Sequence, residues 1–516
     1  TITWWQALES QYDDLVADVV KKFNETQSLI TVEAQYIGSY KDINEALVAA
    51  HAAGTGLPAI AVANTDYVAS YGDSGLYENL DPYIAATNYD VDDFSAGLLL
   101  SSQFEGKQVA LPFLHSTQVI YYNKTMADAN GWTIPEKIED FTPFLAEVHK
   151  TAGVYGTVVP GWDQWYFETM YLNEGVQIIT DDNTCDLGSD TALGVTSMIK
   201  DWCDAGDAYF AAGTDASATM RQNFYDQKTF SVMHTSSLYN NYVDKCPDFE
   251  VGMAWYPAAS TGDKNSEVGG CVLGIPSKND QATKNAAWQF LQFLCGKEVN
   301  MEWAEGTGYL PTRNSVLETD EGKQFLEKKP AFQCIFDNLN LINPRIQNSA
   351  WSELATTWKN YMEVIMNQGG DVDSNSEDMV TEIDEILEGK RDEHLMEQAA
   401  KAPFDEKISI ISLILAKLDV EFKAYAQKED YLEVLFGELK AFKRSLEGKA
   451  EAGETIETVP QTPIAIFSQQ IEAFTAVSEQ KQKAGLLTRQ EKYRCADIAA
   501  DMNRYLQTVK AELLSG

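Results

Sequence analysis

The first part of the chain alternates between short apolar runs and stretches in which apolar side chains recur every three or four positions. Apolar, β-rich runs occupy residues 1–8, 29–38 and 58–63. Between them, residues 12–23 and 42–53 have the spacing of helices with one buried face. This β-α-β-α-β order predicts a mostly parallel sheet with helices on its faces.

The same alternation continues beyond residue 100. The segments "QVALPF" and "QVIYYN" are expected to be strands that cross towards a second lobe, and "GGCVLGIP" (269–276) is expected to be another strand. Residues 285–296 predict an amphipathic helix, and helices dominate from there to about residue 390. The fold class expected for residues 1–390 is therefore α/β.

Residues 391–516 have a different pattern. From 408 to 446 the apolar positions are alternately three and four apart, which predicts a long helix with an apolar seam. A polar stretch interrupts this pattern, and similar seams follow in 463–477 and from 488 onward. We expect an all-α helical bundle of three antiparallel helices, with 391–401 as a candidate fourth.

Charge and composition support a boundary near 390–404. Residues 1–390 hold 57 acidic and 22 basic residues, a balance of −35, whereas residues 391–516 hold 21 and 17, a balance of −4. All 11 Trp precede residue 359. So abrupt a change fits two separate domains, and it also permits a fusion of two unrelated proteins. The total charge of −39 argues against nucleic acid or anionic lipid as the main partner.

The sequence gives little support for metal chemistry or a membrane span. The seven Cys contain no CxxC pair and the five His contain no HExxH motif, so we expect neither a metal site nor a cofactor. Disulfides stay open, with Cys185 and Cys203 as the nearest pair. No apolar run is long enough to span a bilayer, and no signal segment begins the chain, so an exported protein would be present in its mature form.

The apolar run 59–63 ends at Asn64-Thr65-Asp66-Tyr67, which raises a question about function. These polar residues are suited to start the next helix. The end of a strand in an α/β domain is also where ligands are bound. The two roles are compatible.

Nine segments, taken in order, give the first region a family resemblance. It resembles the extracellular solute-binding proteins of ABC importers, in the branch that binds sugars and glycerol 3-phosphate. The segments are "ITWWQALE", "IGSYKD", "NTDYVASYGDSGLYENLDPYI", "ALPFLHSTQVIYYNKTMADANGW", "PGWDQW", "VMHTSS", "VGGCVLGIPSKN", "WAEGTGYLPTRNSV" and "NPRIQN". The likeness covers about residues 1–390 and does not extend to 391–516.

The resemblance implies a two-lobed α/β periplasmic-binding-protein fold with the ligand in the cleft between the lobes. We expect one lobe at about 1–110 plus 260–312, and the other at about 111–259 plus 313–390. The family implies capture of a sugar or glycerol phosphate without chemistry, and delivery to an ABC permease. It also implies an extracellular, periplasmic or cell-surface location.

The resemblance also names candidate ligand-binding residues, each with a structural alternative. A polyhydroxylated ligand needs fixed hydrogen-bond partners and an aromatic face. Asp66 is a candidate acceptor of hydroxyl protons, or a helix cap. Gly270 allows close backbone approach, or only a bulge. The candidates are Tyr40, Asp66, Ser116, Trp162, Trp165, Ser236, Gly270, Tyr309 and Arg345, with Trp162 and Trp165 as an expected stacking pair in a loop.

Arg345 bears most on the class of ligand. It looks like the family arginine that meets a phosphate, and a phosphate favours a bidentate guanidinium; the alternative is a salt bridge on an acidic surface. Asp66 stands where the glycerol-3-phosphate proteins carry Glu and sugar-binding relatives often carry Asp. An oligosaccharide therefore stays open as the ligand.

Two other function classes are not excluded by the residues. A glycosidase needs two carboxylates that face one sugar bond, and the acidic residues supply many pairs, although no catalytic motif accompanies them. An adaptor would use 391–516 to bind a protein partner or to self-associate. A self-contained bundle is the simpler interpretation of the apolar seams, and we expect no catalytic residues.

Overall fold

The computed structural model describes residues 1–401, with side chains to Arg391, and also Glu479 and Lys483. The chain divides into two compact units, Thr1–Asp384 and Glu385–Gly516. The seams expected to form helices between 408 and 516 therefore lie outside the described residues. Within the described part, residues 391–401 continue the helix α17 (Val372–Lys401) instead of forming a separate element.

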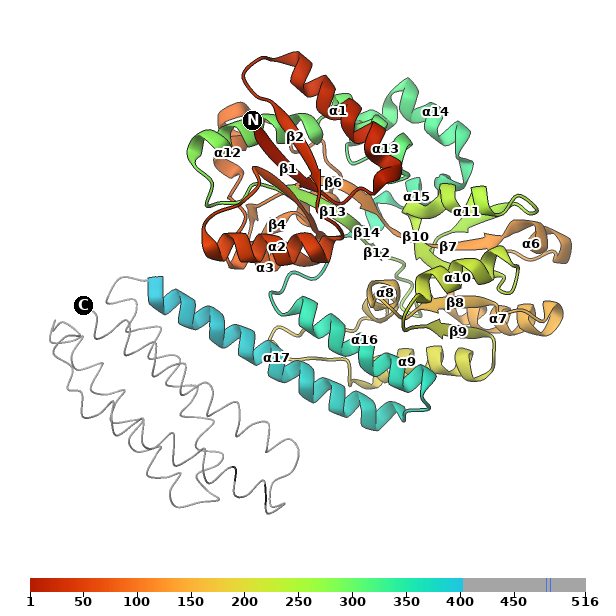
Figure 1. Ribbon diagram of the computed structural model, residues 1–516. Helices are drawn as coiled ribbons and strands as arrows, with labels where there is room; N and C mark the ends of the chain where they lie inside the picture. The colour runs from red at the N-terminus through yellow and green to blue at the C-terminus, as the bar shows by residue number, and fades with distance from the viewer. Residues whose placement is uncertain (402–478, 480–482, 484–516) are drawn as a thin grey trace. The chain divides into compact units, whose positions relative to one another are not determined.

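The first lobe of Thr1–Asp384 is built on a five-stranded sheet (Figure 1). Its strand order is β2-β1-β3-β13-β6. Strands β1, β2 and β3 pair in parallel, and β13 is antiparallel to both of its neighbours, so the expected mostly parallel sheet has one reversed strand. The strands are β1 (Ile2–Gln6), β2 (Val32–Tyr36), β3 (Ile60–Asn64), β6 (Leu111–Ser116) and β13 (Gly269–Gly274).

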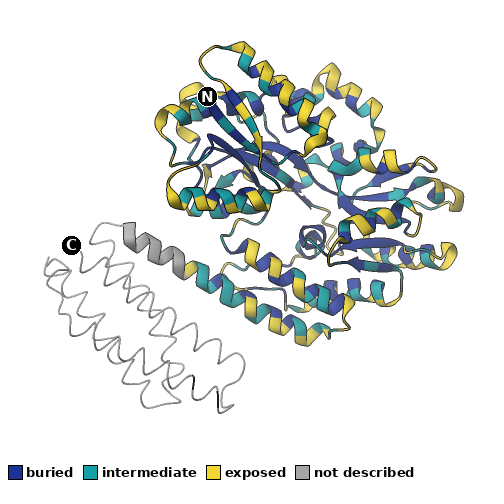
Figure 2. Ribbon diagram, in the orientation of Figure 1, coloured by how far each residue is buried: buried dark blue, intermediate teal, exposed yellow. Residues whose placement is uncertain are grey.

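Helices cover both faces of this sheet because their apolar positions follow the helical period. On α1, Val16, Val19 and Phe23 are buried, while the opposite face is exposed (Figure 2). At the start of α2, Ser39 and Asp42 form a reciprocal capping box. The main helices of this lobe are α1 (Asp13–Thr26), α2 (Tyr40–Ala53), α12 (Gln281–Leu294) and α13 (Lys297–Thr307).

The second lobe has its own sheet and core. An antiparallel sheet of order β10-β7-β11 is joined by a parallel pair, β8 and β9. The strands are β7 (Gln118–Asn123), β8 (Thr157–Pro160), β9 (Ala208–Ala211), β10 (Ser231–Thr235) and β11 (Val251–Ala254). The main helices are α7 (Ile138–Ala152), α8 (Trp165–Asn173), α9 (Asp190–Asp204), α10 (Ala216–Tyr225), α11 (Tyr239–Lys245), α14 (Asp320–Lys328) and α16 (Trp351–Asn367).

Short elements complete the described fold. They are α3 (Val68–Asp73), α4 (Asp81–Thr87), α5 (Ala96–Leu100), β4 (Gln103–Phe104), β5 (Lys107–Gln108), α6 (Lys124–Asn130), β12 (Ser266–Glu267), α15 (Gln333–Phe336) and β14 (Ile342–Asn343). Among them, β12 and β14 pair in parallel, which brings residue 267 and the chain just before Arg345 close together.

The chain passes between the lobes at slightly different places from those expected. The expected division placed residue 111 in the second lobe, but β6 pairs with β13 in the first sheet, so the crossing falls at Thr117. Thr117 is fully buried. Leu310 was expected in the first lobe; its side chain packs in the core of the second lobe, while its N–H donates to the His115 carbonyl of β6 in the first. Strand pairing and core packing, which the local pattern does not report, decide where these segments lie.

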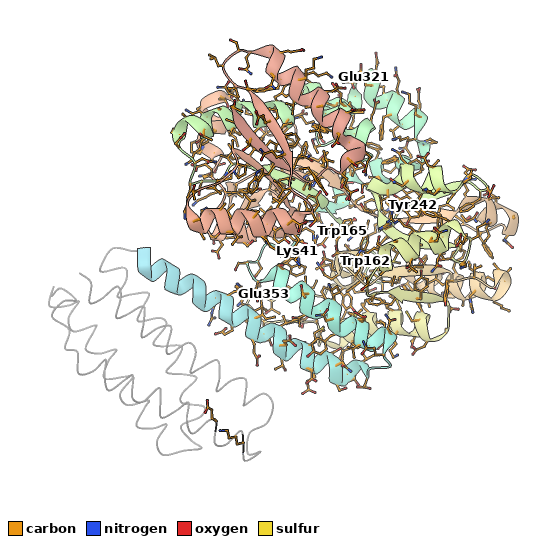
Figure 3. The ribbon with its side chains drawn as sticks, viewed as in Figure 1. Lys41, Trp162, Trp165, Tyr242, Glu321 and Glu353 are labelled. Atoms are coloured by element: carbon orange, nitrogen blue, oxygen red, sulfur yellow. The ribbon has the colours of Figure 1, made fainter. Side chains whose placement is uncertain are left out.

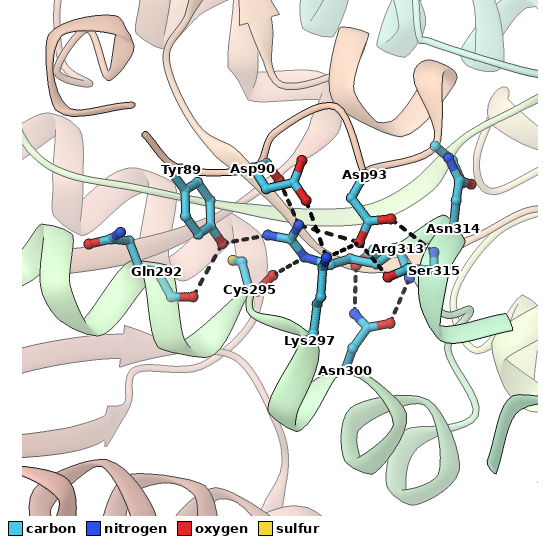
Figure 4. A network of polar contacts seen from close by, with 12 residues as sticks. Tyr89, Asp90, Asp93, Gln292, Cys295, Lys297, Asn300, Arg313, Asn314 and Ser315 are labelled. Atoms are coloured by element: carbon cyan, nitrogen blue, oxygen red, sulfur yellow. Dashed lines mark hydrogen bonds and ion pairs between the residues drawn. The ribbon is translucent and has the colours of Figure 1, made fainter. Parts of the chain in front are cut away.

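Three residues after Leu310, Arg313 binds the chain to the first lobe (Figure 4). Its guanidinium donates to the Cys295 carbonyl (2.9 Å), to the Asp90 carbonyl (2.7 Å) and to the Tyr89 hydroxyl (2.7 Å). It also lies 4.1 Å above the centre of the Phe94 ring. All of these partners belong to the first lobe, so Arg313 holds the chain around residue 313 against that lobe.

The described residues also settle two smaller points. The six cysteines among them, including Cys185 and Cys203, are free, so none forms a disulfide. None of the described helices combines the length and the apolar character needed to cross a bilayer.

Candidate functional site

A pocket of about 320 Å³ opens at the carboxyl ends of the first-lobe strands. The segment between β1 and α1 lines it, together with Tyr40 at the start of α2 and Cys271 of β13. From the second lobe, Ser237 and Leu238 reach the same space, and Tyr309 comes from the second crossing. Its walls therefore come from both lobes, at the position where α/β sheets bind ligands.

Tyr40 and Tyr309 are the two predicted site residues that line this pocket. Burial raises the pKa of Tyr309 to about 12, and nearby Cys271 adds to the rise. Burial likewise raises the pKa of Tyr40. Both phenols therefore stay protonated at neutral pH, where each hydroxyl can donate and accept a hydrogen bond.

The pocket wall continues along one face of the β6–β13 pair. Leu114 and Cys271 are paired opposite each other, and so are Ser116 and Gly269 two residues further along. Because side chains on one face of a strand recur every second residue, these four positions share a face. A side chain at Gly269 would lie 2.6 Å from the Trp165 ring and 2.8 Å from the Ser116 hydroxyl. Trp165 thus covers this end of the wall.

Trp165 does not occupy the loop expected for it. It is the first residue of α8, and its backbone N–H donates a hydrogen bond to the Asp163 carboxylate at 3.0 Å. The indole is 4% exposed, and its N–H has no hydrogen-bond partner among the described residues. Figure 3 shows Trp162 and Trp165 near the middle of the two-lobed unit.

Trp162 contacts the ring of His234 and shares the ring of Tyr166 with Trp165. It makes edge contacts with Tyr166 at 5.5 Å and with His234 at 5.7 Å between ring centres. Its neighbour Gly161 is required because a side chain there would lie 2.1 Å from the Phe210 ring. Of the two tryptophans expected to stack on a ligand, Trp165 lies against the Ser116–Gly269 wall.

The two predicted serines have unequal surroundings. Ser116 ends β6 at the Trp165 wall, and it is 3% exposed. Ser236 is fully buried, and its hydroxyl accepts a hydrogen bond from the Thr117 N–H at 3.0 Å. The Ser236 N–H in turn donates to the Thr117 carbonyl at 2.9 Å. Ser236 therefore anchors the first crossing, and its neighbour Ser237 is the serine that lines the pocket.

Gly270 has a backbone role. Its φ is +91°, a left-handed conformation that favours glycine. A side chain there would also lie 2.0 Å from the Leu114 carbonyl oxygen. The close approach expected at this glycine is thus made to the neighbouring strand β6.

Asp66 and Arg345 meet in an ion pair. Asn64, and not Asp66, caps the turn after β3: its side chain accepts from the Asp66 N–H at 3.0 Å. The Asp66 carboxylate is thereby free to approach Arg345, with 3.0 Å between Oδ1 and Nη1. Of the two roles open for Asp66, capping is taken by its neighbour.

Arg345 lies in a buried cluster of acids rather than on the surface. Its Nε is 3.0 Å from Oε1 of Glu168 and 3.7 Å from Oε2 of Glu267. Its Nη2 donates to Gln164 at 3.0 Å when the amide is oriented to satisfy both neighbours. The Arg345 side chain is 3% exposed, so the surface salt bridge considered from the sequence is wrong.

Burial controls the protonation of this acid cluster. It raises the pKa of Asp66 to about 6 against the attraction of the Arg345 charge, with Asp163 and Glu168 adding to the rise. It raises the pKa of Glu168 well above the usual range, again against Arg345, and the neighbouring Glu267 contributes. The pKa of Glu267 is raised too, chiefly by burial. Burial therefore favours the protonated forms of Glu168 and Glu267.

Glu168, Glu267 and the β1–α1 segment were not among the predicted site residues. The acids gave no signal because 78 Asp and Glu residues occur in the chain and neither lies in a distinctive motif. The β1–α1 segment did have a signal in the sequence, because it follows the end of a predicted strand, as Asp66 does. Among the described residues, no group of three or more His, Cys, Asp or Glu side chains has the arrangement of a metal site.

The pattern of the bacterial extracellular solute-binding protein family matches residues 18–333, more than half of the chain. The protein belongs to this family. This match confirms the family resemblance found in the sequence. The extracellular location expected from that resemblance is confirmed with it.

Relatives of this solute-binding protein include two glycerol-phosphate binders. The sn-glycerol-3-phosphate-binding periplasmic protein UgpB of Pectobacterium atrosepticum is 26% identical over 349 residues, which is 64% of this chain and 77% of the relative. UgpB of Escherichia coli K12 is 25% identical over 350 residues, with 64% and 78% covered.

Solved structures show the same two-lobed fold. UgpB of Mycobacterium tuberculosis, in complex with glycerophosphocholine, aligns with a TM-score of 0.67 at 21% identity over 75% of this chain and 98% of its own. The cyclic α-maltosyl-1,6-maltose-binding protein of Arthrobacter globiformis aligns with a TM-score of 0.65 at 20% identity, over 75% and 99%. At this identity the likeness shows the fold and not the ligand.

Proposed function

We propose that this solute-binding protein captures a polyhydroxylated solute, a sugar or a glycerol phosphate, between its lobes and delivers it to an ABC importer. The observation that carries the proposal is the pocket at the strand ends, because both lobes and the second crossing contribute to its walls. A volume of about 320 Å³ lies in the range of small-molecule sites. The names of the relatives, which bind glycerol phosphates and maltose-like sugars, support the same class.

The side chains around the pocket suit such a solute. The hydroxyls of Tyr40, Tyr309 and Ser237 each can donate and accept, as sugar hydroxyls require. Leu8, Phe113 and Leu114 supply apolar surface for the C–H groups of the solute. We place Trp165, Ser116 and Asp66 at the far end of the same cleft, where the unpartnered indole N–H of Trp165 is available as a donor.

Calorimetric titration of the full chain with a panel of solutes tests this proposal. The panel contains sn-glycerol 3-phosphate, glycerophosphocholine, maltose, a cyclic oligosaccharide and a pentitol. We expect at least one to bind with micromolar or tighter affinity, and Tyr309→Phe to weaken it about fivefold through loss of one hydrogen bond worth roughly 1 kcal/mol. The exposed Tyr36→Phe is the matched control and should leave affinity unchanged. Failure of the whole panel, or turnover of a glycoside, would contradict the proposal.

We also propose that residues 391–516 form a separate helical bundle, on the basis of the apolar seams in the sequence. The division of the chain at residue 384 supports a boundary nearby. Limited proteolysis of the full chain, followed by mass spectrometry, tests this: cleavage should concentrate after α17, between about 402 and 407, and leave solute binding intact. Cleavage spread evenly through 408–516 would contradict a folded bundle.

A further inference from the structure

We propose that Asp66 is a specificity-determining residue that prevents Arg345 from binding phosphate, so that the cleft selects uncharged sugars and polyols over phosphorylated solutes. The inference rests on the proposed function, since it narrows the class of solute bound in the same cleft. It reverses the role that the sequence suggested for Arg345.

Each nitrogen of the Arg345 guanidinium already has a polar neighbour. Asp66 Oδ1 lies 3.0 Å from Nη1, Gln164 accepts from Nη2 when its amide is so oriented, and Glu168 Oε1 lies 3.0 Å from Nε. Bidentate recognition of a phosphate needs two adjacent N–H donors of one guanidinium. A phosphate that approached two of these donors would therefore have to compete with the Asp66 carboxylate and crowd against the other polar neighbours.

Burial within the cluster shows which partner stands between Arg345 and the cleft. The side chains of Glu168 and Glu267 are 0% and 4% exposed, and that of Arg345 is 3% exposed. Asp66 is 25% exposed and follows β3 of the first lobe. It is thus the acid partner of Arg345 with appreciable access to solvent.

The charge balance also disfavours an anion. One arginine faces Asp66, Glu168 and Glu267, and Asp163 lies close enough to influence the group. Even with one proton shared between the two glutamates, negative charge exceeds positive charge here. Like charges placed against the wrong ligand are a recognised route to specificity. A neutral polyol would still find the carboxylate of Asp66 as an acceptor.

Titration with sn-glycerol 3-phosphate tests the inference directly. We expect Asp66→Asn to bind it at least tenfold more tightly than the unmodified chain, because the amide keeps the size of the side chain and removes the charge. The gain should vanish in Asp66→Asn/Arg345→Gln and should shrink as NaCl is raised. Asp18→Asn, an exposed change of equal charge on α1, is the matched control and should give no gain.

Glu267→Gln provides a second variant that leaves Asp66 in place. It removes charge from behind Arg345, and we expect a smaller gain of two- to fivefold for sn-glycerol 3-phosphate. Circular dichroism and thermal unfolding establish that each variant is folded before titration.

The outcomes separate this inference from the proposed function. Folded Asp66→Asn and Glu267→Gln variants without any gain would overturn the inference, while binding of a neutral sugar would still support the proposed function. Tight binding of sn-glycerol 3-phosphate by the unmodified chain, lost in Arg345→Gln, would overturn the inference alone. If the unmodified chain binds no solute of the panel, the proposed function fails, whereas a gain in Asp66→Asn would still support the role of Asp66.

Discussion

Arg313 and Arg345 are both buried in a strongly acidic region, yet their surroundings differ in kind. Arg313 donates mainly to neutral groups, two backbone carbonyls and a phenol, and stacks on a ring (Figure 4). One carboxylate, Asp93, lies 3.6 Å away. Arg345 instead has acids at three positions around it.

The difference shows that the partners of a buried arginine decide whether it holds chain segments together or is suited to influence ligand binding. The partners of Arg313 come from one lobe, and their geometry suits a fork of fixed donors, so this site holds two chain segments together. The partners of Arg345 come from both lobes and carry more charge than the arginine can balance. Such a cluster is costly to bury for stability alone, which supports the proposed role in ligand selection.

Among the substitutions that test this difference, removal of Arg313 should have the largest effect on the free energy of unfolding. Arg313→Ala leaves the Cys295 and Asp90 carbonyls without their donor, and we expect the free energy of unfolding to fall by about 3–5 kcal/mol. Urea denaturation followed by tryptophan fluorescence measures it. Lys21→Ala, on the exposed face of α1, should change stability by less than about 0.5 kcal/mol. Equal effects of the two changes would remove the structural role assigned to Arg313.

Substitutions of Glu168 should separate its charge from its volume. Burial raises the pKa of this carboxyl and favours its protonated form, so Glu168→Gln should cost less than about 1 kcal/mol. Glu168→Ala opens a cavity beside Arg345 and should cost about 2–4 kcal/mol. The same denaturation experiment compares them. If Gln proves as costly as Ala, Glu168 is ionised and the proton assignment in the cluster is wrong.

The pH dependence at Asp66 should be smaller and should favour acid. The pKa of Asp66 is about 6 in the folded chain, against 3.8 for an unperturbed aspartate. As pH falls, the folded state therefore takes up this proton at a higher pH than the unfolded state does. The free energy of unfolding should therefore rise between pH 7 and pH 5, by about 1 kcal/mol from this group. Asp66→Asn should remove that part of the rise. An identical pH profile in the variant would show that Asp66 does not titrate in this window.

Asp93, beside Arg313, should give the smallest effect, with the opposite sign. Burial opposes its ionisation, but hydrogen bonds from Ser315 and the charges of Lys297 and Arg313 outweigh burial and lower its pKa. The stabilising contribution of Asp93 is complete above 3.8, the pKa of an unperturbed aspartate. It is lost as pH falls through the lower pKa of the folded state. Asp93→Asn should reduce the loss of stability below pH 4, measured by thermal unfolding. An unchanged acid limb would contradict this assignment.

Much of the fold of residues 1–384 could be predicted from local pattern. The apolar run 58–63 corresponds to β3, and the helical spacing of 42–53 corresponds to α2. These elements were predictable because each buries one face whose period is visible in the sequence. The lobe boundary was harder, since the pairing of β6 with β13 joins segments more than 150 residues apart.

The candidate site was predictable only in part. Tyr40 and Tyr309 were named from the family resemblance, and both line the pocket. Trp165 was expected in a loop and begins a helix, because the Asp163 cap precedes it. Glu168 and Glu267 had no local signal that set them apart from the other acids of the chain.

The sequence by itself determined the alternation of strands and helices, the acidic balance and the family. These properties depend on the period and the identity of residues that are neighbours in the chain. Only the tertiary structure decided what Arg345 contacts, because its partners come from the turn after β3, from α8 and from β12, and folding brings them within 4 Å. Coulomb energy and desolvation depend on distance in space and on burial, and neither is written in the order of the residues.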